Sequence, residues 1–507
     1  MKNKLFNVVP IRKPKTNVFD LSHERKIFFN MGQLIPMYLE EVVPGDKFRV
    51  NSEVLMRLAP MIAPMMHRVN VFTHYFFVPY RLLWSNWENF ITGGADGLSS
   101  PTFPTMPINN TYKDLYYTGN LSDYLGIPPT NSGMTISNQV NISALPFRAY
   151  HLIYNEYYRD QNVENAVMIT KNDTVAPSEL AILAVTRKRA WEKDYFTSAL
   201  PWTQRGGEVT LPGTPDYMDP ALIYKTGGNL KPTTGAITAD GDTPAHMQDS
   251  GNTDLRIENL DGYDIGINDV RRAFKLQEWL EKNARAGSRY IEQMLSHFGV
   301  KSSDARLQRP EYLGGGKTPI VVSEVLNTSA TTTEPQGNMS GHGIAVGNTH
   351  SFSKYFEEHG IVMGIMSVLP RTAYQQGIEK LFFKTDKFDY FWPEFAHLGE
   401  QKILKKELYV AYTGTNTNED TFGYTPRYAE YKFKNSSYHG DFRSDLSFWH
   451  MGRIFSSLPS LNSTFMQADP THRIFAVTDP SEHKLFCQVY NNVQAIRPIP
   501  VFGEPTI

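Results

Sequence analysis

The sequence predicts a mainly β protein with many long loops. Aromatic residues make up 13 % of the 507 residues, and aromatic side chains favour strands and protein–protein interfaces. Glycines and prolines are scattered along the whole chain, which is typical of strands joined by irregular loops. The clearest strand, residues 69–78, is apolar on both faces, so we expect it to be covered on both sides.

The N-terminal part of the chain contains the next elements in order. Residues 48–58 predict a strand, and residues 82–91 predict a short helix carrying two tryptophans. Residues 93–142 are polar and rich in turn-forming residues, which predicts a long surface excursion. Helices are predicted for residues 143–158, with Ser143 as the cap, and for residues 179–193.

Residues 203–265 have a different composition. Ten acidic residues stand against four basic ones, and glycine, proline and threonine are frequent. A loop of this length inside a compact fold is usually functional or disordered. We interpret this segment as an exposed insertion.

The strongest predicted helix follows, with Asn268 as its cap. It is interrupted at Gly287, and a second helix ends at Gly299. Leu276 and Trp279 lie away from its main apolar stripe, so the helix is either buried twice or faces a second subunit. The main stripe consists of Val270, Ala273, Phe274, Leu280 and Ala284.

The remainder of the chain is predicted to be strands joined by irregular loops. It contains no internal repeat, no heptad pattern and no obvious boundary between two self-contained domains. The candidate strands are residues 320–325, 361–369, 407–412, 473–478 and 484–493.

The first twenty residues form a basic arm without an acidic residue before Asp20. Pro10 and Pro14 disfavour a helix there. Two interpretations stay open: a solvated terminus, or an arm that touches phosphate or crosses onto a neighbouring subunit. The whole chain carries 50 basic and 52 acidic residues, which argues against coating nucleic acid along its entire surface. The basic residues of the arm are Lys2, Lys4, Arg12, Lys13 and Lys15.

Several classes of chemistry find no support in the sequence. The single cysteine, Cys487, excludes an intrachain disulfide and fits a small buried apolar residue. The opening residues do not read as a signal peptide, and no apolar run has membrane-spanning length. We therefore expect a chain that matures without oxidation.

Motifs of catalysis also fail. The sequence around Lys317 resembles the end of a phosphate-binding loop, but Glu311 stands where that loop needs glycine and Pro319 where its helix should begin. Residues 341–347 are too long for a dinucleotide fingerprint and are better interpreted as a flexible loop. His342, His350 and His359 lack a metal-ligand spacing, and no nucleophile elbow occurs, so we expect no enzyme.

A set of unusual sequence segments gives the strongest indication of function. Residues 194–206 hold three large aromatics and a proline with little local periodicity, so long-range packing or a neighbouring subunit must hold them. This stretch resembles a signature of the major capsid proteins of the Microviridae, small phages with single-stranded DNA, and the gokushovirus-like subgroup in particular. Further segments resemble the same family and occur in the same order along the chain. They are residues 29–36, 41–46, 73–81, 145–150, 304–315, 358–360, 428–432 and 448–450.

The resemblance implies one domain over residues 1–507, an eight-stranded antiparallel viral jelly roll (a β-sandwich) with large insertions and a few helices. Sixty copies would form a T=1 icosahedral shell around circular single-stranded DNA. The segment 203–265 would be the threefold protrusion that contacts a host surface receptor. An internal scaffolding protein, a pilot protein and a small basic DNA-binding protein are the other implied partners. The protein would be assembled in the host bacterial cytoplasm and would reside in the virion.

Specific residues follow from this interpretation. We expect Trp202 and Trp279 at subunit contacts. No cofactor is expected, apart from the hypothesis that acidic loops bind divalent cations between subunits. The alternative function is a carbohydrate-binding or carbohydrate-active β-sandwich, because aromatic-rich jelly rolls also bind sugars. The candidate DNA-contacting residues are the five basic residues of the arm, Lys2, Lys4, Arg12, Lys13 and Lys15, together with Lys402, Lys405 and Lys406.

Overall fold

The computed structural model falls into two compact units, Met1–Pro201 with Lys301–Ile507, and Trp202–Val300. The first unit contains nearly all the strands. The described residues are 15–131, 133–207, 209, 224–225, 228–229, 267–287, 290–299, 308–328, 336–414, 417–479 and 481–502.

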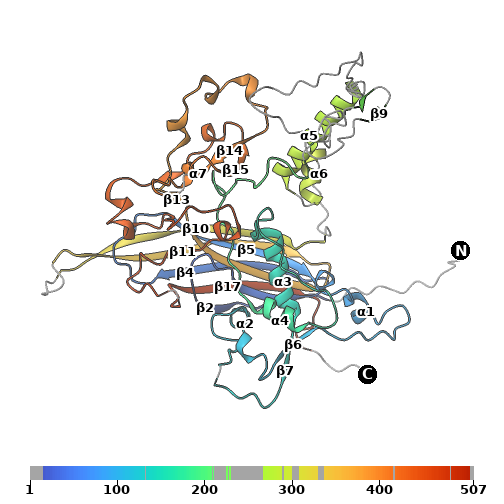
Figure 1. The fold of residues 1–507 in the computed structure, drawn as a ribbon. Coiled ribbons are helices and arrows are strands. Elements are labelled where there is room, and N and C mark those ends of the chain that lie inside the picture. Colours follow the sequence, from blue (N-terminus) through green and yellow to red (C-terminus); the bar gives the residue numbers. More distant parts are fainter. Residues whose placement is uncertain are drawn as a thin grey trace, which may run out of the picture. The chain divides into compact units, whose positions relative to one another are not determined.

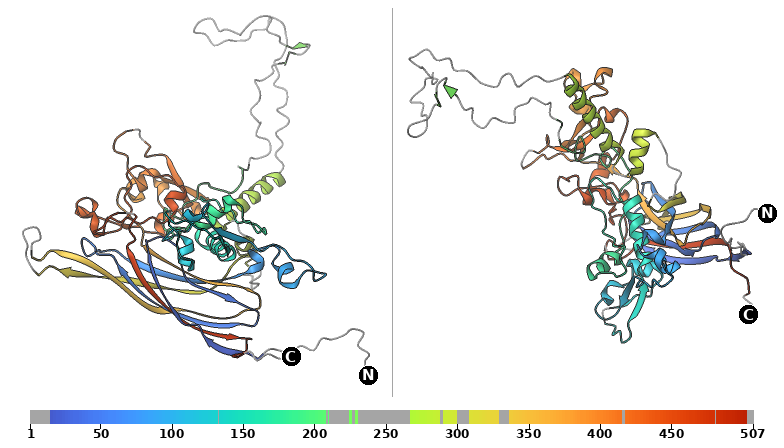
Figure 2. Two further views of the ribbon diagram at one scale, coloured as in Figure 1. Left: turned by 90° about the horizontal axis from the view of Figure 1, so that it is seen from below. Right: turned by 90° about the vertical axis from the view of Figure 1, so that its right-hand side faces the viewer.

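The first unit is built on one antiparallel sheet that curls on itself (Figures 1 and 2). Its strand order is β1-β17-β4-β11-β10-β5-β12-β3, and β2 lies beside β1 along the same edge of β17. This arrangement confirms the predicted jelly roll. The strands are β1 (Asn17–Asp20), β2 (His23–Phe29), β3 (Ile35–Val42), β4 (Lys47–Leu58), β5 (Val69–Pro79), β10 (Glu311–Leu326), β11 (Met339–Tyr355), β12 (Gly360–Pro370) and β17 (Leu485–Arg497).

Polar contacts cross the interior between strands that are distant in the sheet. The Tyr75 hydroxyl donates to Ser52 Oγ, which donates to Asn491 Oδ1, each over 2.5 Å. The Asn491 amide then donates to the Met37 carbonyl over 3.2 Å. β5, β4, β17 and β3 therefore enclose one core. Buried residues alternate with outward ones along β4 and β17, and both predicted strands are confirmed with slightly longer bounds.

β5 and β12 are covered on both faces. This confirms the coverage predicted for residues 69–78, and it also confirms that residues 361–369 form a strand. One face joins the jelly-roll core, and the other packs Phe76, Val78 and Met363 against a helical layer. Because neither face meets water, both strands are apolar nearly throughout. The layer contains α2 (Leu121–Leu125), α3 (Leu145–Ile153), α4 (Pro177–Ala184), the hairpin β6 (Thr105–Ile108) with β7 (Val140–Ser143), and α1 (Trp87–Thr92) beside the 3-10 turn Tyr80–Leu82.

The predicted helices are confirmed in part. The N-cap of α3 is Ala144 and not the predicted Ser143, although Ser143 Oγ accepts from the Leu145 backbone N–H over 3.2 Å. α3 continues as a π-helical turn to Tyr158. α4 ends at Ala184, so helix over residues 185–193 was wrong. There the chain is extended, and Ala190 forms a bridge with Gln467.

Two predicted strands were wrong. Residues 407–412 overlap α7 (Lys405–Leu408), because the Glu407 carboxylate accepts from the Leu404 backbone N–H over 2.9 Å and starts a helical turn. Residues 473–478 form turns, with a single bridge from Phe475 to Met61. The remaining short elements of this unit are β13 (Ala373–Tyr374), β14 (Glu400–Leu404), β15 (Thr421–Pro426), β16 (Ser436–Ser437), α8 (Ser463–Met466) and 3-10 turns at Lys113–Leu115, Lys380–Phe383, Lys387–Asp389, Pro393–Phe395, Ala429–Tyr431, Gly440–Arg443 and Ser447–Trp449.

The glycine-rich segment 341–347 was also predicted wrongly, since it lies in the middle of β11. A Cβ on Gly341 would stand 2.5 Å from the Ala63 carbonyl oxygen, and one on Gly343 would stand 2.4 Å from a Leu58 methyl group. These glycines therefore allow neighbouring segments of the chain to approach the strand closely, and they do not make it flexible.

The signature run is held by long-range packing within the chain, which confirms one of the two expectations for it. Tyr195, Phe196 and Leu200 are buried, and Phe196 packs edge-on against Tyr374 with ring centroids 4.9 Å apart. The Tyr195 hydroxyl donates to Glu407 over 2.9 Å, and burial beside this carboxylate raises the pKa of Tyr195. These contacts order residues 194–200 without a second subunit.

The second unit contains two helices, α5 (Ile267–Ala286) and α6 (Tyr290–Phe298). Gly287 and Gly299 adopt positive φ values after them, as predicted. Asn268 lies inside the first turn instead of capping it. The predicted insertion 203–265 falls almost wholly outside the described residues, apart from 203–207, 209, β8 (Tyr224–Lys225) and β9 (Gly228–Asn229).

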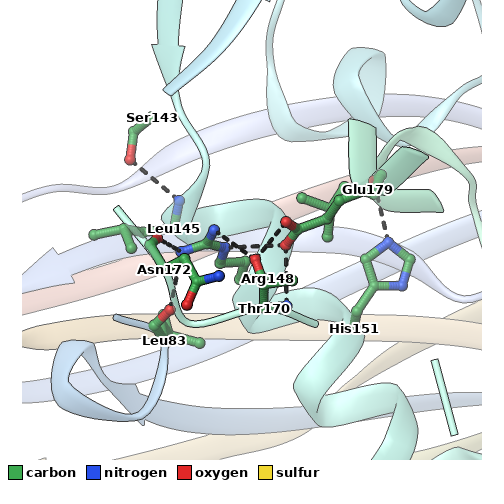
Figure 3. A network of polar contacts seen from close by, with 9 residues as sticks. Leu83, Ser143, Leu145, Arg148, His151, Thr170, Asn172 and Glu179 are labelled. Atoms are coloured by element: carbon green, nitrogen blue, oxygen red, sulfur yellow. Dashed lines mark hydrogen bonds and ion pairs between the residues drawn. The ribbon is translucent and has the colours of Figure 1, made fainter. Parts of the chain in front are cut away.

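A buried ion pair ties α3 to α4 in the helical layer (Figure 3). Arg148 Nε lies 3.4 Å from Glu179 Oε1, and the two side chains are 0 % and 4 % exposed. The guanidinium also donates to the Leu83 and Asn172 carbonyls, over 3.2 and 3.1 Å, and Glu179 accepts from Thr170. Burial lowers the pKa of Arg148, and the neighbouring carboxylate opposes this shift.

His151 on α3 makes stability depend on pH. Its Nε2–H donates to the Leu183 carbonyl, and Nδ1 accepts from Arg187. Burial, followed by the charge of Arg187, lowers the pKa of His151 to about 3. A histidine in an unfolded chain has a pKa of about 6.5. As the pH falls below that value, His151 therefore binds a proton in the unfolded chain but stays neutral in the folded chain.

We therefore expect His151 to lower the free energy of unfolding by up to ~1.4 kcal/mol per pH unit between pH 6 and 4. Urea unfolding of His151→Gln should show a shallower slope, because the variant cannot take up this proton. The exposed residue His439 provides the control, since His439→Gln should retain the parent slope. Equal slopes for His151→Gln and the parent would contradict the prediction.

Candidate assembly surfaces and nucleic-acid contacts

An aromatic patch lies on the first unit, on and beside the 3-10 turns that follow β13. We define it as Phe388, Tyr390, Phe391, Trp392 and Tyr431, which are 47–55 % exposed. Soluble monomers rarely expose apolar groups in such a cluster, whereas aromatics are enriched at interfaces. The patch is therefore a candidate assembly surface.

The patch is held in place by the chain around it. Phe391 packs edge-on against Tyr431 at 6.4 Å, and the Trp392 indole donates to the Lys387 carbonyl over 2.9 Å. The Lys384 ammonium lies 3.8 Å from the Tyr431 ring centroid and 3.1 Å from Glu430. These contacts fix half-exposed rings before any partner arrives, which lowers the entropy cost of binding.

A second exposed apolar surface is the ribbon where β10 pairs with β11, which extends beyond the other strands (Figures 1 and 2). Val321, Val325 and Leu326 on β10 are 53–63 % exposed. Val346 on β11 is 71 % exposed. A ribbon with outward branched side chains presents strand surface that a neighbouring copy can cover.

The two predicted interface tryptophans lie in the second unit, outside the jelly-roll core. Trp279 is 49 % exposed, and its ring lies 6.0 Å from that of His297. Trp202 is partly buried under the Arg205 guanidinium, 4.9 Å from the ring centroid. Trp202 and Phe274 help to line a cavity of about 560 Å³, and Phe274 is 68 % exposed. The exposure of α5 favours the second-subunit interpretation over double burial.

The candidate DNA-contacting lysines differ in their surroundings. Lys402 on β14 is exposed. Lys405 lies 3.0 Å from Asp420, and Lys406 lies 2.5 Å from Glu419 and over the Phe383 ring, so phosphate would compete with carboxylates there. Lys15 is exposed, while Lys2, Lys4, Arg12 and Lys13 lie outside the described residues.

Sequence reasoning missed an aromatic surface of mixed charge on the outward face of the sheet. Phe28 on β2 stacks on Phe486 on β17, with ring centroids 4.6 Å apart, and both are exposed. Exposed Lys26 on β2 and exposed Arg49 and Arg57 on β4 share this face with the carboxylates Glu24 and Glu53. Cationic side chains beside stacking rings suit single-stranded DNA.

Other kinds of site receive no support from the described part of the chain. Among those residues, no three His, Cys, Asp or Glu side chains gather closely enough to hold a metal ion. The helices described there are too short or too polar to cross a membrane. Cys487 is buried, and burial raises the pKa of its thiol to about 12.

Comparison with known proteins identifies the family. The model of a family described as "Capsid protein (F protein)" matches residues 8–507. The capsid protein VP1 of Chlamydia phage 1 is 35 % identical over 100 % of this chain and 98 % of its own length. VP1 of Bdellovibrio phage phiMH2K is 36 % identical (99 % and 97 % covered), and VP1 of Spiroplasma virus 4 is 30 % identical (96 % and 94 %).

These matches extend along essentially the whole chain, so they cover the jelly roll, the helical layer and the second unit together. The family is structural, which confirms that the chain is not an enzyme and is a component of the virion capsid. The family match therefore favours the capsid interpretation over the alternative of a carbohydrate-binding or carbohydrate-active β-sandwich. The chain belongs to the F-type capsid proteins of the Microviridae, and its relatives are the VP1 major capsid proteins of gokushoviruses.

Proposed function

We propose that this major capsid protein closes a T=1 shell of sixty copies around circular single-stranded DNA. The observation that carries the proposal is the aromatic patch, because soluble monomers rarely expose such a cluster of rings and exposed apolar patches mark interaction sites. A closed shell also covers the exposed β10–β11 ribbon.

The DNA contacts belong to the same proposal. The basic arm, Lys402 and the outward face of the sheet supply cations and stacking rings. Because the chain as a whole is nearly neutral, a small basic DNA-binding protein would neutralise most of the genome. A scaffolding protein and a pilot protein would complete assembly, and divalent cations at acidic loops remain a further proposal.

Negative-stain electron microscopy of cells that express the chain with its scaffolding protein tests the shell. We expect uniform small isometric particles. Soluble monomers alone, with scaffolding protein present, would contradict the proposal.

The segment 203–265 is proposed to contact the host receptor at a threefold protrusion. Its acidic, glycine-rich composition supports an exposed insertion with no role in the jelly-roll core. We expect a shortened segment to leave shell formation intact and to reduce host attachment in a binding assay with intact cells. Loss of shells on shortening would contradict this assignment.

A further inference from the structure

A cleft of about 520 Å³ opens beside β3 and α1, away from the assembly surfaces described above. Aromatic rings form its walls: Tyr80 and Trp87 lie 4.6 Å apart, and Phe90 and Phe103 lie 5.6 Å apart. Phe90 is 41 % exposed although its neighbours are packed. The other lining residues are Leu39, Glu40, Glu41, Ser143, Leu145, Pro146 and Ile361.

One carboxylate stands at this aromatic cleft. Glu41 is exposed and accepts a hydrogen bond from the Tyr80 hydroxyl over 2.8 Å. The neighbouring Glu40 points to the opposite face of β3, where its Oε1 lies 3.6 Å from an Arg497 guanidinium nitrogen. Aromatic faces combined with a carboxylate favour a cationic ligand, because the ring quadrupoles and the negative charge act in the same direction.

The basic arm leaves the fold beside this cleft. Asn17, the first residue of β1, pairs with Arg497 on β17. The Arg497 guanidinium in turn donates to the Glu41 carbonyl oxygen over 2.5 Å. Lys13 is four residues before Asn17, and four residues span up to about 13 Å. The arm therefore begins within reach of the Glu41 carboxylate.

We propose that this cleft is the docking site of the chain's own basic arm, with Arg12 or Lys13 seated between the aromatic walls and the Glu41 carboxylate. The arm carries no acidic residue before Asp20, so its charge complements the cleft. A tether of a few residues holds the cations at a high local concentration, which favours the same chain over a neighbouring copy. Docking and DNA contact compete for the same cations.

Limited trypsin digestion of the full-length chain tests docking, with cleavage after Arg12 followed by mass spectrometry. Glu41→Gln and Phe90→Ala should each speed this cleavage about five- to tenfold, because each removes one part of the cation site. Glu88→Gln is the matched control, since Glu88 is an exposed acid on the same helix as Phe90 and does not line the cleft. Its cleavage rate should equal that of the parent.

Two further measurements keep the result interpretable. Unchanged thermal unfolding of Glu41→Gln would attribute faster cleavage to the arm alone. Parent cleavage rates that stay constant on dilution would support docking within one chain, whereas protection that disappears on dilution would overturn it. Equal rates for the parent, Glu41→Gln and Phe90→Ala would overturn the proposal altogether.

Discussion

Replacing Tyr390 and Trp392 of the aromatic patch with aspartate is expected to abolish shell formation while the subunit still folds. Both side chains are about half exposed in the single chain, so the fold itself depends little on the exposed part of each ring. Covering the exposed half of each ring at an interface contributes about 0.8–1.5 kcal/mol, and aspartate adds the larger cost of burying a charge. The combined loss corresponds to at least ~100-fold in the concentration needed for assembly.

The measurement is sedimentation of the expressed protein, with electron microscopy of the fast fraction and urea unfolding of the slow one. The matched control is Leu98→Asp with Met168→Asp, which introduces two charges at side chains that are 82 % and 73 % exposed and lie outside the patch. Control shells should form normally. Normal shells from the Tyr390→Asp/Trp392→Asp protein would show that the patch does not mediate assembly.

The strands that could be predicted from the sequence are those whose side-chain pattern matches their burial. β5 and β12 are apolar on both faces because the core covers one face and the helical layer the other. β17 alternates because its outward face meets water. In each case the local pattern records the environment directly.

Residues 320–325 of β10 were predicted as a strand, but the first half of β10 was not, because close backbone approach shapes its sequence. β10 contains three consecutive glycines, and a Cβ on Gly315 would lie 2.2 Å from the Thr73 carbonyl oxygen. The irregular register between Tyr312 and Gly314 places Gly314 at a φ of +151°. A glycine run of this kind resembles a loop, and only the neighbouring β5 explains it.

The candidate surfaces show the same limit. The sequence shows many aromatic residues around Phe388 and Trp392. The exposure of these side chains depends on short 3-10 turns, which no periodic pattern of residues predicts. The family resemblance drew attention to Trp202, and the helical pattern drew attention to Trp279. Both lie outside the jelly-roll core as expected, and their role in subunit contacts stays a prediction. Lys405 and Lys406 looked free because their carboxylate partners lie more than ten residues away in the chain.

The largest expected loss of stability follows from breaking the buried ion pair of the helical layer. Arg148→Met leaves the Glu179 carboxylate in an interior where its side chain is 4 % exposed. Removing one partner of a buried pair costs about 3–5 kcal/mol, because the remaining charge is uncompensated. Urea unfolding of the subunit should show this decrease in the free energy of unfolding. A decrease below ~1 kcal/mol would contradict a buried, paired charge.

Arg148→Met/Glu179→Met separates the charge from the hydrogen bonds. Removing both charges should recover part of the lost stability, since two apolar side chains of similar volume can replace a buried pair. Recovery should stop short of the parent by about 1–3 kcal/mol, because the Leu83 and Asn172 carbonyls would each lose the donor that Arg148 supplies. Full recovery would mean that these carbonyls find other donors. A double variant less stable than Arg148→Met would mean that Glu179 stabilises the layer through its hydrogen bond with Thr170 rather than through Arg148. Partial recovery would show that the pair serves chiefly to give the Leu83 and Asn172 carbonyls a donor, because one guanidinium reaches both carbonyls at once.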